Sequence, residues 1–238
     1  MTQPHVHPHC EPGTVRDVPR PGWLELLVGL AVMALVTVSL APLLNQLGMS
    51  APTAGIVSGV LSGGAGLVAF AAAALVRIRS WRVFGVRRTT VRWLLLGVAG
   101  GFAALVAKIV TVPLFTALFD VETDTQASYV AGAGAGAGSL VLMMLTLAVL
   151  TPIGEEFLFR GVVTTVLLRY GALVGVVGSA VVFALMHGIN VVLPSALIIG
   201  LITAELYRRS RSIWPGVVVH AVNNAIGIAI FALVPTTV

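Results

Sequence analysis

Long apolar segments, separated by short polar connections, recur along the chain. A helix needs about 20 consecutive apolar residues to cross the hydrocarbon core of a bilayer, and each segment is long enough to predict one span. The sequence therefore predicts an all-α fold, a polytopic transmembrane helical bundle of about seven spans, or eight if segment 161–170 counts separately. We expect the spans at residues 23–44, 54–76, 93–118, 139–170, 172–188, 191–207 and 213–233.

The amino-acid composition agrees with a membrane protein. Of the 238 residues, 58% are hydrophobic and only 10% are charged, whereas about 25% of the residues in a soluble domain are charged. A water-soluble core of this size could not bury so much apolar side chain. The composition therefore excludes a soluble enzyme and a disordered protein, and the single cysteine, Cys10, excludes an intrachain disulfide.

Two connections between the apolar segments are rich in arginine, with six arginines over 77–92 and three over 208–211. Connections of this kind face the cytoplasm, whereas segment 119–138 has three acidic residues and no basic one. We therefore expect a cytoplasmic N-terminus and an external C-terminus. The apolar segments predict an integral membrane protein, and we expect it in the plasma membrane of a bacterium. The lipid bilayer is the expected partner of the arginines. Nucleic acid is not, because these basic stretches are short connections between helices rather than one basic face.

The order of segments predicts four regions: a disordered cytoplasmic tail over 1–22, three N-terminal transmembrane helices over 23–118, an external Gly/Ala-rich loop over 119–138, and further transmembrane helices over 139–238. Segment 132–138 alternates glycine with alanine, which favours a flexible linker. Glycines recur every four residues in the second and third spans, and this spacing favours close helix packing. The tail carries three histidines near Cys10, but in a flexible segment we interpret them as incidental rather than as a metal site.

Ionisable residues inside a span are costly to bury and are candidates for function. The first three spans contain Lys108, for which we favour a structural role. All other candidates lie in the C-terminal half of the chain, on successive apolar segments. They are Glu155, Glu156, Arg160, His187, Glu205, His220 and Asn224.

Helical spacing arranges these candidates into one site. Glu156 lies four residues before Arg160 and can pair with it, whereas Glu155 is rotated away by about 100°. Glu155 lies sixteen residues before Gly171, and His187 lies sixteen residues after it. If Gly171 is the tip of a helical hairpin, Glu155 and His187 are therefore at the same level of the bundle.

His220 and Asn224 share one face of the last span because they are also four residues apart. A buried carboxylate can take a proton from water, a histidine can orient that water, and a second histidine with an amide can stabilise an oxyanion. Interhelical hydrogen bonding is the alternative, and for Glu156 with Arg160 alone it is the favoured one. The complete set favours a hydrolytic site.

The motifs Glu155-Glu156-x-x-x-Arg160, Phe183-x-x-x-His187 and His220-x-x-x-Asn224 resemble the CPBP family, the CAAX prenyl protease and bacteriocin-processing (Abi) intramembrane endopeptidases. The resemblance covers roughly residues 140–228. It implies an intramembrane endopeptidase in which Glu155 activates water with help from His187. It further implies that His220 and Asn224 stabilise the oxyanion and that Glu156 and Arg160 hold the site together.

The resemblance implies a membrane-associated peptide or protein as substrate and leaves the cofactor open. Members of this family have been described both as glutamate proteases and as metalloproteases. We favour the glutamate chemistry without a cofactor, and zinc is the alternative, because two histidines and a carboxylate could bind it although no H-E-x-x-H helix is present. Two other functions stay open: a proton-coupled transporter, and a catalytically silent immunity or scaffold protein.

Overall fold

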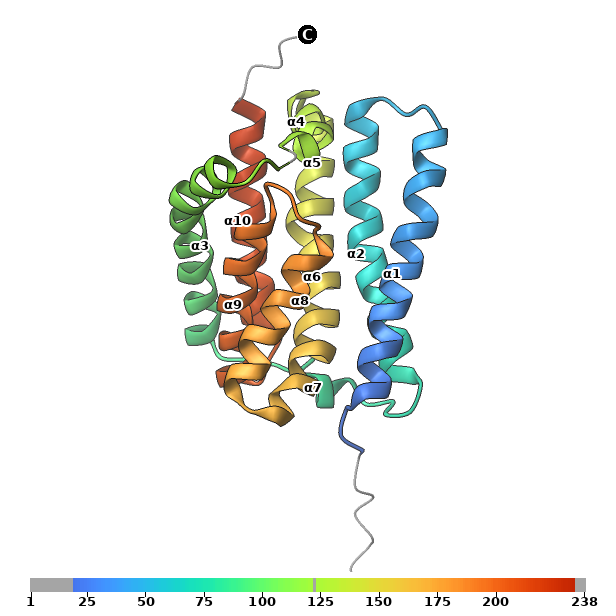
Figure 1. Ribbon diagram of the computed structural model, residues 1–238, viewed down its shortest axis with the longest axis vertical. Helices are drawn as coiled ribbons and strands as arrows, with labels where there is room; N and C mark the ends of the chain where they lie inside the picture. The colour runs from blue at the N-terminus through green and yellow to red at the C-terminus, as the bar shows by residue number, and fades with distance from the viewer. Residues whose placement is uncertain (1–18, 122, 234–238) are drawn as a thin grey trace, which may run out of the picture.

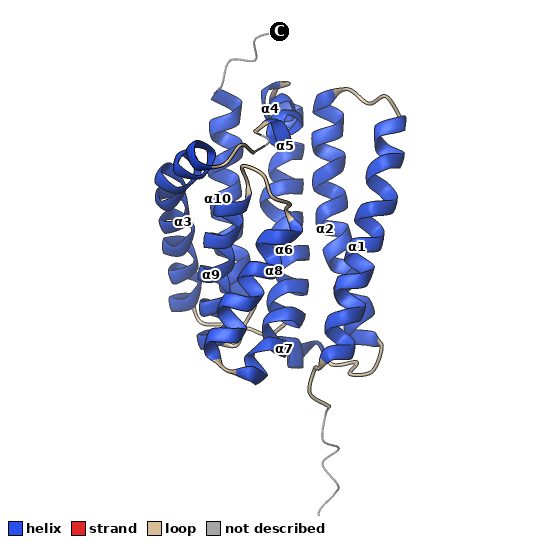
Figure 2. Ribbon diagram, in the orientation of Figure 1, coloured by secondary structure: helices blue, strands red, loops and turns tan. Residues whose placement is uncertain are grey.

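The computed structural model describes residues 19–121 and 123–233, which form a helical bundle without a β-strand in those ranges (Figures 1 and 2). The predicted all-α polytopic bundle is therefore confirmed. The helices of the N-terminal half and of the connection that follows are α1 (Trp23–Gln46), α2 (Ala51–Leu75), η1 (Trp81–Phe84), α3 (Val91–Leu118), η2 (Asp124–Gln126) and α4 (Ala127–Gly134).

The C-terminal half begins with one long helical stretch, Ala137–Tyr170, which consists of α5 (Ala137–Met143), η3 (Met144–Leu150), α6 (Thr151–Glu156), η4 (Phe157–Thr164), α7 (Thr165–Leu167) and η5 (Leu168–Tyr170). The remaining helices are η6 (Val174–Gly178), α8 (Ser179–Met186), α9 (Leu193–Ser210) and α10 (Trp214–Leu233). Within the described residues, five helices are long and apolar enough to cross a membrane: α1, α2, α3, the stretch Ala137–Tyr170 and α10. The two other expected spans correspond to η6 with α8 and to α9, and the count of seven stays a prediction.

Both arginine-rich connections lie at the end of the bundle where α1 begins, opposite α4 (Figure 1). They contact each other directly, because Nε of Arg87 donates a 2.7 Å hydrogen bond to the carbonyl oxygen of Arg211. At the same end, Arg77 donates two hydrogen bonds to the fully buried carboxylate of Glu25 and ties the start of α1 to the end of α2. The basic residues thus share one end of the molecule, while the side of the membrane that this end faces stays a prediction.

The regularly spaced glycines let helices approach at backbone distance, as the sequence predicts. A Cβ atom at Gly63 would lie 2.7 Å from the backbone of Leu150, and one at Gly154 would lie 2.0 Å from the carbonyl oxygen of Gly63. On the other side of the bundle, a Cβ atom at Gly97 would lie 2.7 Å from the carbonyl oxygen of Pro215. Glycine thus brings α2 against η3 and α6, and α3 against α10.

The expectation of a Gly/Ala-rich loop over 119–138 is wrong for its middle part, where Ala127–Gly134 forms α4. Glycine disfavours an isolated helix, but the small side chains of this segment allow close packing that offsets this preference. A Cβ atom at Gly55 of α2 would lie 2.4 Å from the carbonyl oxygen of Ser128, and one at Gly132 would lie 2.7 Å from the sulfur of Met143. The segment covers the ends of α2 and α5 instead of acting as a linker.

The long helical stretch Ala137–Tyr170 contains two wide turns of π-helix, η3 and η4, on either side of α6. Wide turns leave carbonyl groups without their usual partner and occur often at functional sites. Threonine side chains bond two of these carbonyls, since Thr164 donates to Phe159 and Thr165 donates to Arg160. The stretch ends at Gly171, whose φ of +108° favours glycine, and the chain then returns through η6 and α8.

Candidate active site

Glu155 lies near the end of α6, between the two wide turns, and only 4% of its surface is exposed. Ser62 of α2 donates a 2.7 Å hydrogen bond to its Oε1 atom. Its Oε2 atom has no hydrogen-bond partner among the described residues and lies 3.9 Å from Nε2 of His187 and 3.8 Å from Nε2 of His220. One carboxylate oxygen is thus held in place, and the other faces two imidazoles.

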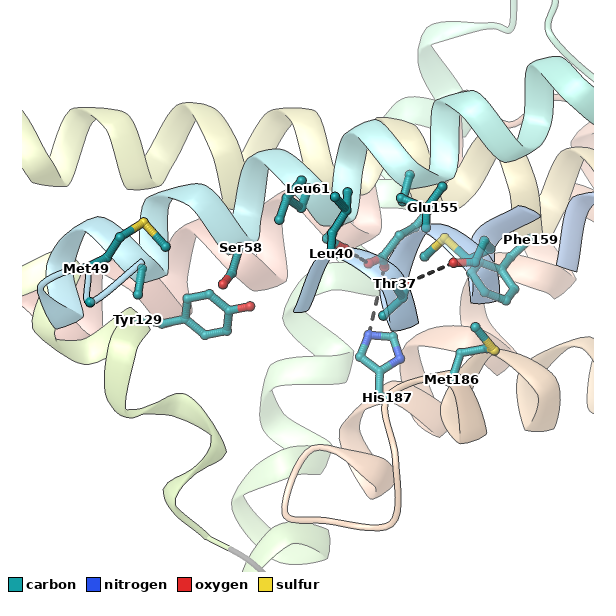
Figure 3. Close-up of a pocket in the computed structure, with 16 residues that line it drawn as sticks. Thr37, Leu40, Met49, Ser58, Leu61, Tyr129, Glu155, Phe159, Met186 and His187 are labelled. Carbon is teal, nitrogen blue, oxygen red and sulfur yellow. Dashed lines mark hydrogen bonds and ion pairs between the residues drawn. The ribbon is translucent and has the colours of Figure 1, made fainter. Parts of the chain in front are cut away.

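His187 follows the last residue of α8, and its imidazole points toward Glu155 (Figure 3). Its Nδ1 atom lies 2.9 Å from the carbonyl oxygen of Phe183, one helical turn earlier. A carbonyl can only accept, so Nδ1 carries the proton in this contact and Nε2 of the neutral ring is an acceptor. The ring of Phe183 packs against both imidazoles, with centroids 4.7 Å from His187 and 5.8 Å from His220.

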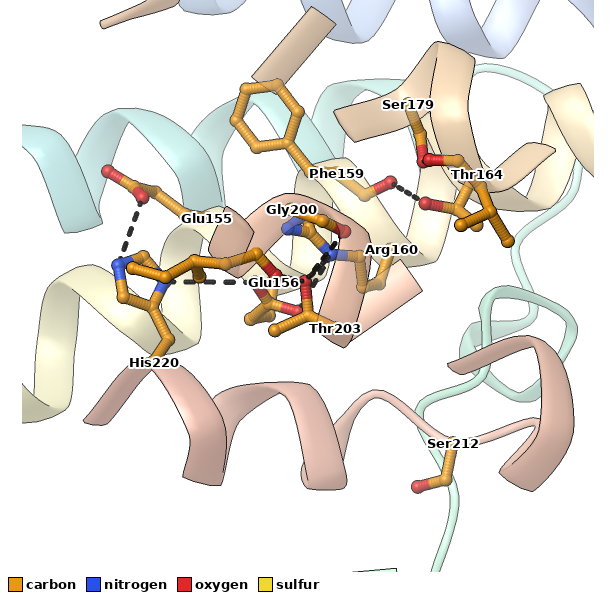
Figure 4. A network of polar contacts seen from close by, with 12 residues as sticks. Glu155, Glu156, Phe159, Arg160, Thr164, Ser179, Gly200, Thr203, Ser212 and His220 are labelled. Atoms are coloured by element: carbon orange, nitrogen blue, oxygen red, sulfur yellow. Dashed lines mark hydrogen bonds and ion pairs between the residues drawn. The ribbon is translucent and has the colours of Figure 1, made fainter. Parts of the chain in front are cut away.

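His220 of α10 lies between the two consecutive acids (Figure 4). Its Nε2 atom is 3.8 Å from Glu155, and its Nδ1 atom is 3.7 Å from Oε1 of Glu156. Only 4% of His220 is exposed. The imidazole therefore links the carboxylate that faces the histidines to a second carboxylate deeper in the bundle.

Glu156 and Arg160 form the pair that their spacing predicts, and both are fully buried. Nε of Arg160 lies 3.0 Å from Oε2 of Glu156 and donates a 2.8 Å hydrogen bond to the hydroxyl of Thr203 on α9 (Figure 4). The guanidinium carbon also lies 4.7 Å from the ring centroid of Phe183. Gly216 packs closely against the pair, because a Cβ atom at this position would lie 2.3 Å from Oε2 of Glu156.

Asn224 lines the same cavity as the two histidines, and its Nδ2 atom donates a 2.9 Å hydrogen bond to the carbonyl oxygen of Leu147. That carbonyl belongs to the wide turn η3. Glu205 is not part of the site. It binds Arg208 at 2.7 Å near the arginine-rich end of α9, and 34% of its side chain is exposed.

Two hydroxyl groups that hold the charged residues are not among the residues predicted from the sequence: Ser62 contacts Glu155, and Thr203 contacts Arg160. Tyr129 was not predicted either, because its helix α4 was not expected. Burial raises the pKa of the Tyr129 hydroxyl, and the nearby charge of Glu155 raises it further. The signal for Ser62 is its place between Gly59 and Gly63 on the small-residue face, but hydroxyl residues are common in spans and the signal is weak.

Two cavities meet at Glu155. The first, of about 430 Å³, lies between α1, α2 and the end of α8, and is lined by apolar residues that include Met33, Leu40 and Met186 (Figure 3). The second, of about 550 Å³, lies between α3, α8, α9 and α10. The residues that line both are Ser62, Tyr129, Glu155 and His187. The carboxylate thus stands where an extended molecule could pass from one cavity to the other.

The donor atoms do not fit a metal centre in this arrangement. Among residues 19–121 and 123–233, no group of three or more His, Cys, Asp and Glu side chains is placed to hold a metal ion. The separations of 3.8 and 3.9 Å between Glu155 and the histidines exceed those of ligands about 2.0–2.2 Å from one zinc ion in tetrahedral geometry. We therefore derive no step through a metal.

Residues 137–226 match the family model described as type II CAAX prenyl endopeptidase Rce1-like. The resemblance to the CPBP/CAAX protease family is therefore confirmed over residues 137–226. The match covers the stretch Ala137–Tyr170, the hairpin that follows, α9 and most of α10, and it includes all six residues predicted for the site. No curated protein sequence and no solved structure gave a significant match.

The match to the CAAX protease family model and the apolar helices support an integral membrane protein in which residues 137–226 resemble a CAAX protease-type peptidase. The matched segment begins at the helix that carries Glu155 and ends just past Asn224. Helices α1 to α4 lie outside it, yet α2 supplies Ser62 and α4 supplies Tyr129 to the cavities. The family segment and the preceding helices therefore form the candidate site together.

Proposed function

We propose that the chain is an intramembrane endopeptidase that hydrolyses a peptide bond of a membrane-associated substrate with water activated by Glu155. The observation that carries the proposal is the placement of the free carboxylate oxygen of Glu155 between Nε2 of His187 and Nε2 of His220, at 3.9 and 3.8 Å. The two acceptors Oε2 of Glu155 and Nε2 of His187 lie close enough for one water molecule to donate a hydrogen bond to each of them.

The proton transfer follows from the partners of each group. Glu155 takes a proton from the water, and the hydroxide oxygen forms a bond to the carbonyl carbon of the substrate. His187 holds the water through Nε2, because Nδ1 donates to Phe183. When the tetrahedral intermediate collapses, the C–N bond breaks and the proton passes from Glu155 to the leaving amine. Positioned general bases of this kind contribute about 10²–10⁴-fold in rate.

The negative charge on the carbonyl oxygen is stabilised by His220 and Asn224. An amide group has two N–H donors, and one of those of Asn224 is used by Leu147, so its second N–H remains for the oxyanion. His220 donates to this oxygen through Nε2, the nitrogen that faces Glu155, and Oε1 of Glu156 lies 3.7 Å from its Nδ1. The contacts among Glu156, Arg160 and Thr203 hold His220 in a fixed position relative to the helix that carries Glu155.

The substrate chain occupies both cavities and passes Glu155 where they meet. The cavities lie between helices, and α1, α2, α3 and α10 among these are long and apolar enough to span a bilayer, so neither part of the substrate needs to enter water. The shared residues Ser62 and Tyr129 lie beside the bond to be cleaved. This route requires an extended peptide. A helix is about 10 Å wide, and its backbone carbonyls are already hydrogen-bonded within the helix.

The test compares Glu155→Gln with Glu205→Gln in the full chain reconstituted in lipid vesicles. Both variants replace a glutamate by its neutral isostere, but Glu205 lies at the arginine-rich end, away from the cavities. A library of membrane peptides is incubated with each protein, and products are identified by mass spectrometry. We expect cleavage by the wild type and Glu205→Gln, and a loss of at least about 10²-fold in Glu155→Gln.

Thermal unfolding of both variants in detergent shows whether they are folded. Equal cleavage by the wild type and a folded Glu155→Gln would refute the role of Glu155. If the wild type cleaves no peptide of the library, the endopeptidase proposal fails and a catalytically silent protein is the better account.

A further inference from the structure

Lys108 is a cation inside α3 that no carboxylate compensates among the described residues. It lines the second cavity together with Glu155, His187 and His220. An uncompensated charge within a span is costly and is a functional candidate by default. The contacts of its ammonium group show what could compensate it.

The ammonium of Lys108 donates one hydrogen bond, of 3.2 Å, to Oδ1 of Asn223. An ammonium has three N–H donors, so two remain for other partners in the cavity. Oδ1 of Asn223 is a neutral oxygen and leaves the positive charge unbalanced. The lysine is therefore positioned by the protein, and an anion that enters the cavity would neutralise it.

A row of amide groups fixes this position. Nδ2 of Asn223 donates a 3.0 Å hydrogen bond to Oδ1 of Asn224, and Nδ2 of Asn224 donates to the carbonyl oxygen of Leu147. Because its nitrogen is used in this way, Asn223 must present its oxygen to Lys108. The row links the cation to α10 and to the wide turn η3, which are the elements beside the candidate catalytic residues.

We propose that Lys108 and Asn223 form a subsite for a carboxylate group of the substrate, next to the bond that Glu155 hydrolyses. The inference rests on the proposed function and adds the residue that selects the substrate. Asn223 lies three residues after His220, which is a rise of about 4.5 Å along α10, and an extended peptide advances about 3.3 Å per residue. The carboxylate thus belongs to a residue close to the cleaved bond.

A peptide can supply this carboxylate from its C-terminus or from an aspartate or glutamate side chain, and matched substrates distinguish the two. A peptide that the wild type cleaves is resynthesised with a C-terminal amide and, separately, with its acidic side chain replaced by the corresponding amide. We expect one of the two changes to raise KM by about tenfold or more with kcat little changed, because a charge-assisted hydrogen bond is lost before the chemical step.

The same peptides are then assayed with Lys108→Met, Lys108→Arg and Arg92→Met, all as full chains in lipid vesicles. Arg92 is an exposed cation on the same helix and is the matched control for loss of charge. We expect Lys108→Met to cleave the charged and the neutral peptide with equal KM, Lys108→Arg to keep part of the preference, and Arg92→Met to keep all of it.

If the wild type and a folded Lys108→Met prefer the charged peptide over the neutral one to the same extent, the subsite is overturned. Lys108 would then be a cation that reaches the membrane surface. A wild type that makes no distinction between charged and neutral peptides would also overturn it. Both outcomes leave the proposed function intact if Glu155→Gln is still inactive. Failure of the proposed function appears differently, as cleavage that does not depend on Glu155.

Discussion

Replacing Gly154 by alanine would test how the site depends on the contact between α2 and α6. A Cβ atom at Gly154 would lie 2.0 Å from the carbonyl oxygen of Gly63, whereas ordinary van der Waals contacts begin at 3.4 Å. The opposing atom belongs to the backbone and cannot rotate away, so the helices must separate locally by about 1.4 Å. The 2.7 Å hydrogen bond from Ser62 to Glu155 joins the same two helices. It would lengthen to about 4 Å, beyond hydrogen-bonding distance.

We expect Gly154→Ala to lower the free energy of unfolding by about 1–3 kcal/mol, the usual cost of overpacking, and to reduce cleavage because Glu155 loses its fixed orientation. Thermal unfolding and the peptide assay measure the two effects. Gly64→Ala is the control on α2, because a Cβ atom there meets nothing within 4 Å. Ser62→Ala removes the hydrogen bond without crowding, so it should reduce cleavage with little loss of stability. Equal stability and activity in Gly154→Ala and Gly64→Ala would refute the reasoning.

Three further predictions concern charge, metal and topology. Glu156→Gln and Arg160→Gln should each lower the free energy of unfolding by about 3–5 kcal/mol, because each leaves a buried charge uncompensated. The double variant should lose less than the sum of the two. Additive losses in a double-mutant cycle would mean that the pair is not coupled. Cleavage should survive exhaustive treatment with a metal chelator, and loss of activity that zinc restores would contradict the glutamate mechanism. Reporter fusions should place Thr89 in the cytoplasm and Gly134 outside, and the reverse result would invert the topology.

The helices of the N-terminal half could be predicted closely from the sequence. The second and third spans were expected at 54–76 and 93–118, and the structure has helices at Ala51–Leu75 and Val91–Leu118. Long apolar runs define such helices directly, because the bilayer fixes their length. The helix α4 could not be predicted in this way, since its stability comes from contacts of Gly55 and Gly132 that only the folded bundle provides.

The core of the candidate site could also be predicted, because the equal distances of Glu155 and His187 from Gly171 place both at one level. The structure brings Glu155 within 4 Å of both histidines. Sequence spacing does not give the lateral arrangement of helices, so the contacts of Ser62 and Thr203 were not foreseen. The catalytic roles of all these residues stay predictions.

The two consecutive acids illustrate how one helix can separate a structural charge from a reactive one. Successive residues point about 100° apart, so Glu156 faces Arg160 inside the bundle while Glu155 faces the cavities. Arg160 compensates the charge of Glu156 at 3.0 Å. The partners of Glu155 are the hydroxyl of Ser62 and the imidazoles of His187 and His220, so no lysine or arginine is paired with it among the described residues. A proton that binds to Glu155 or leaves it therefore breaks no ion pair with a lysine or arginine, which agrees with the role of general base that we propose for it.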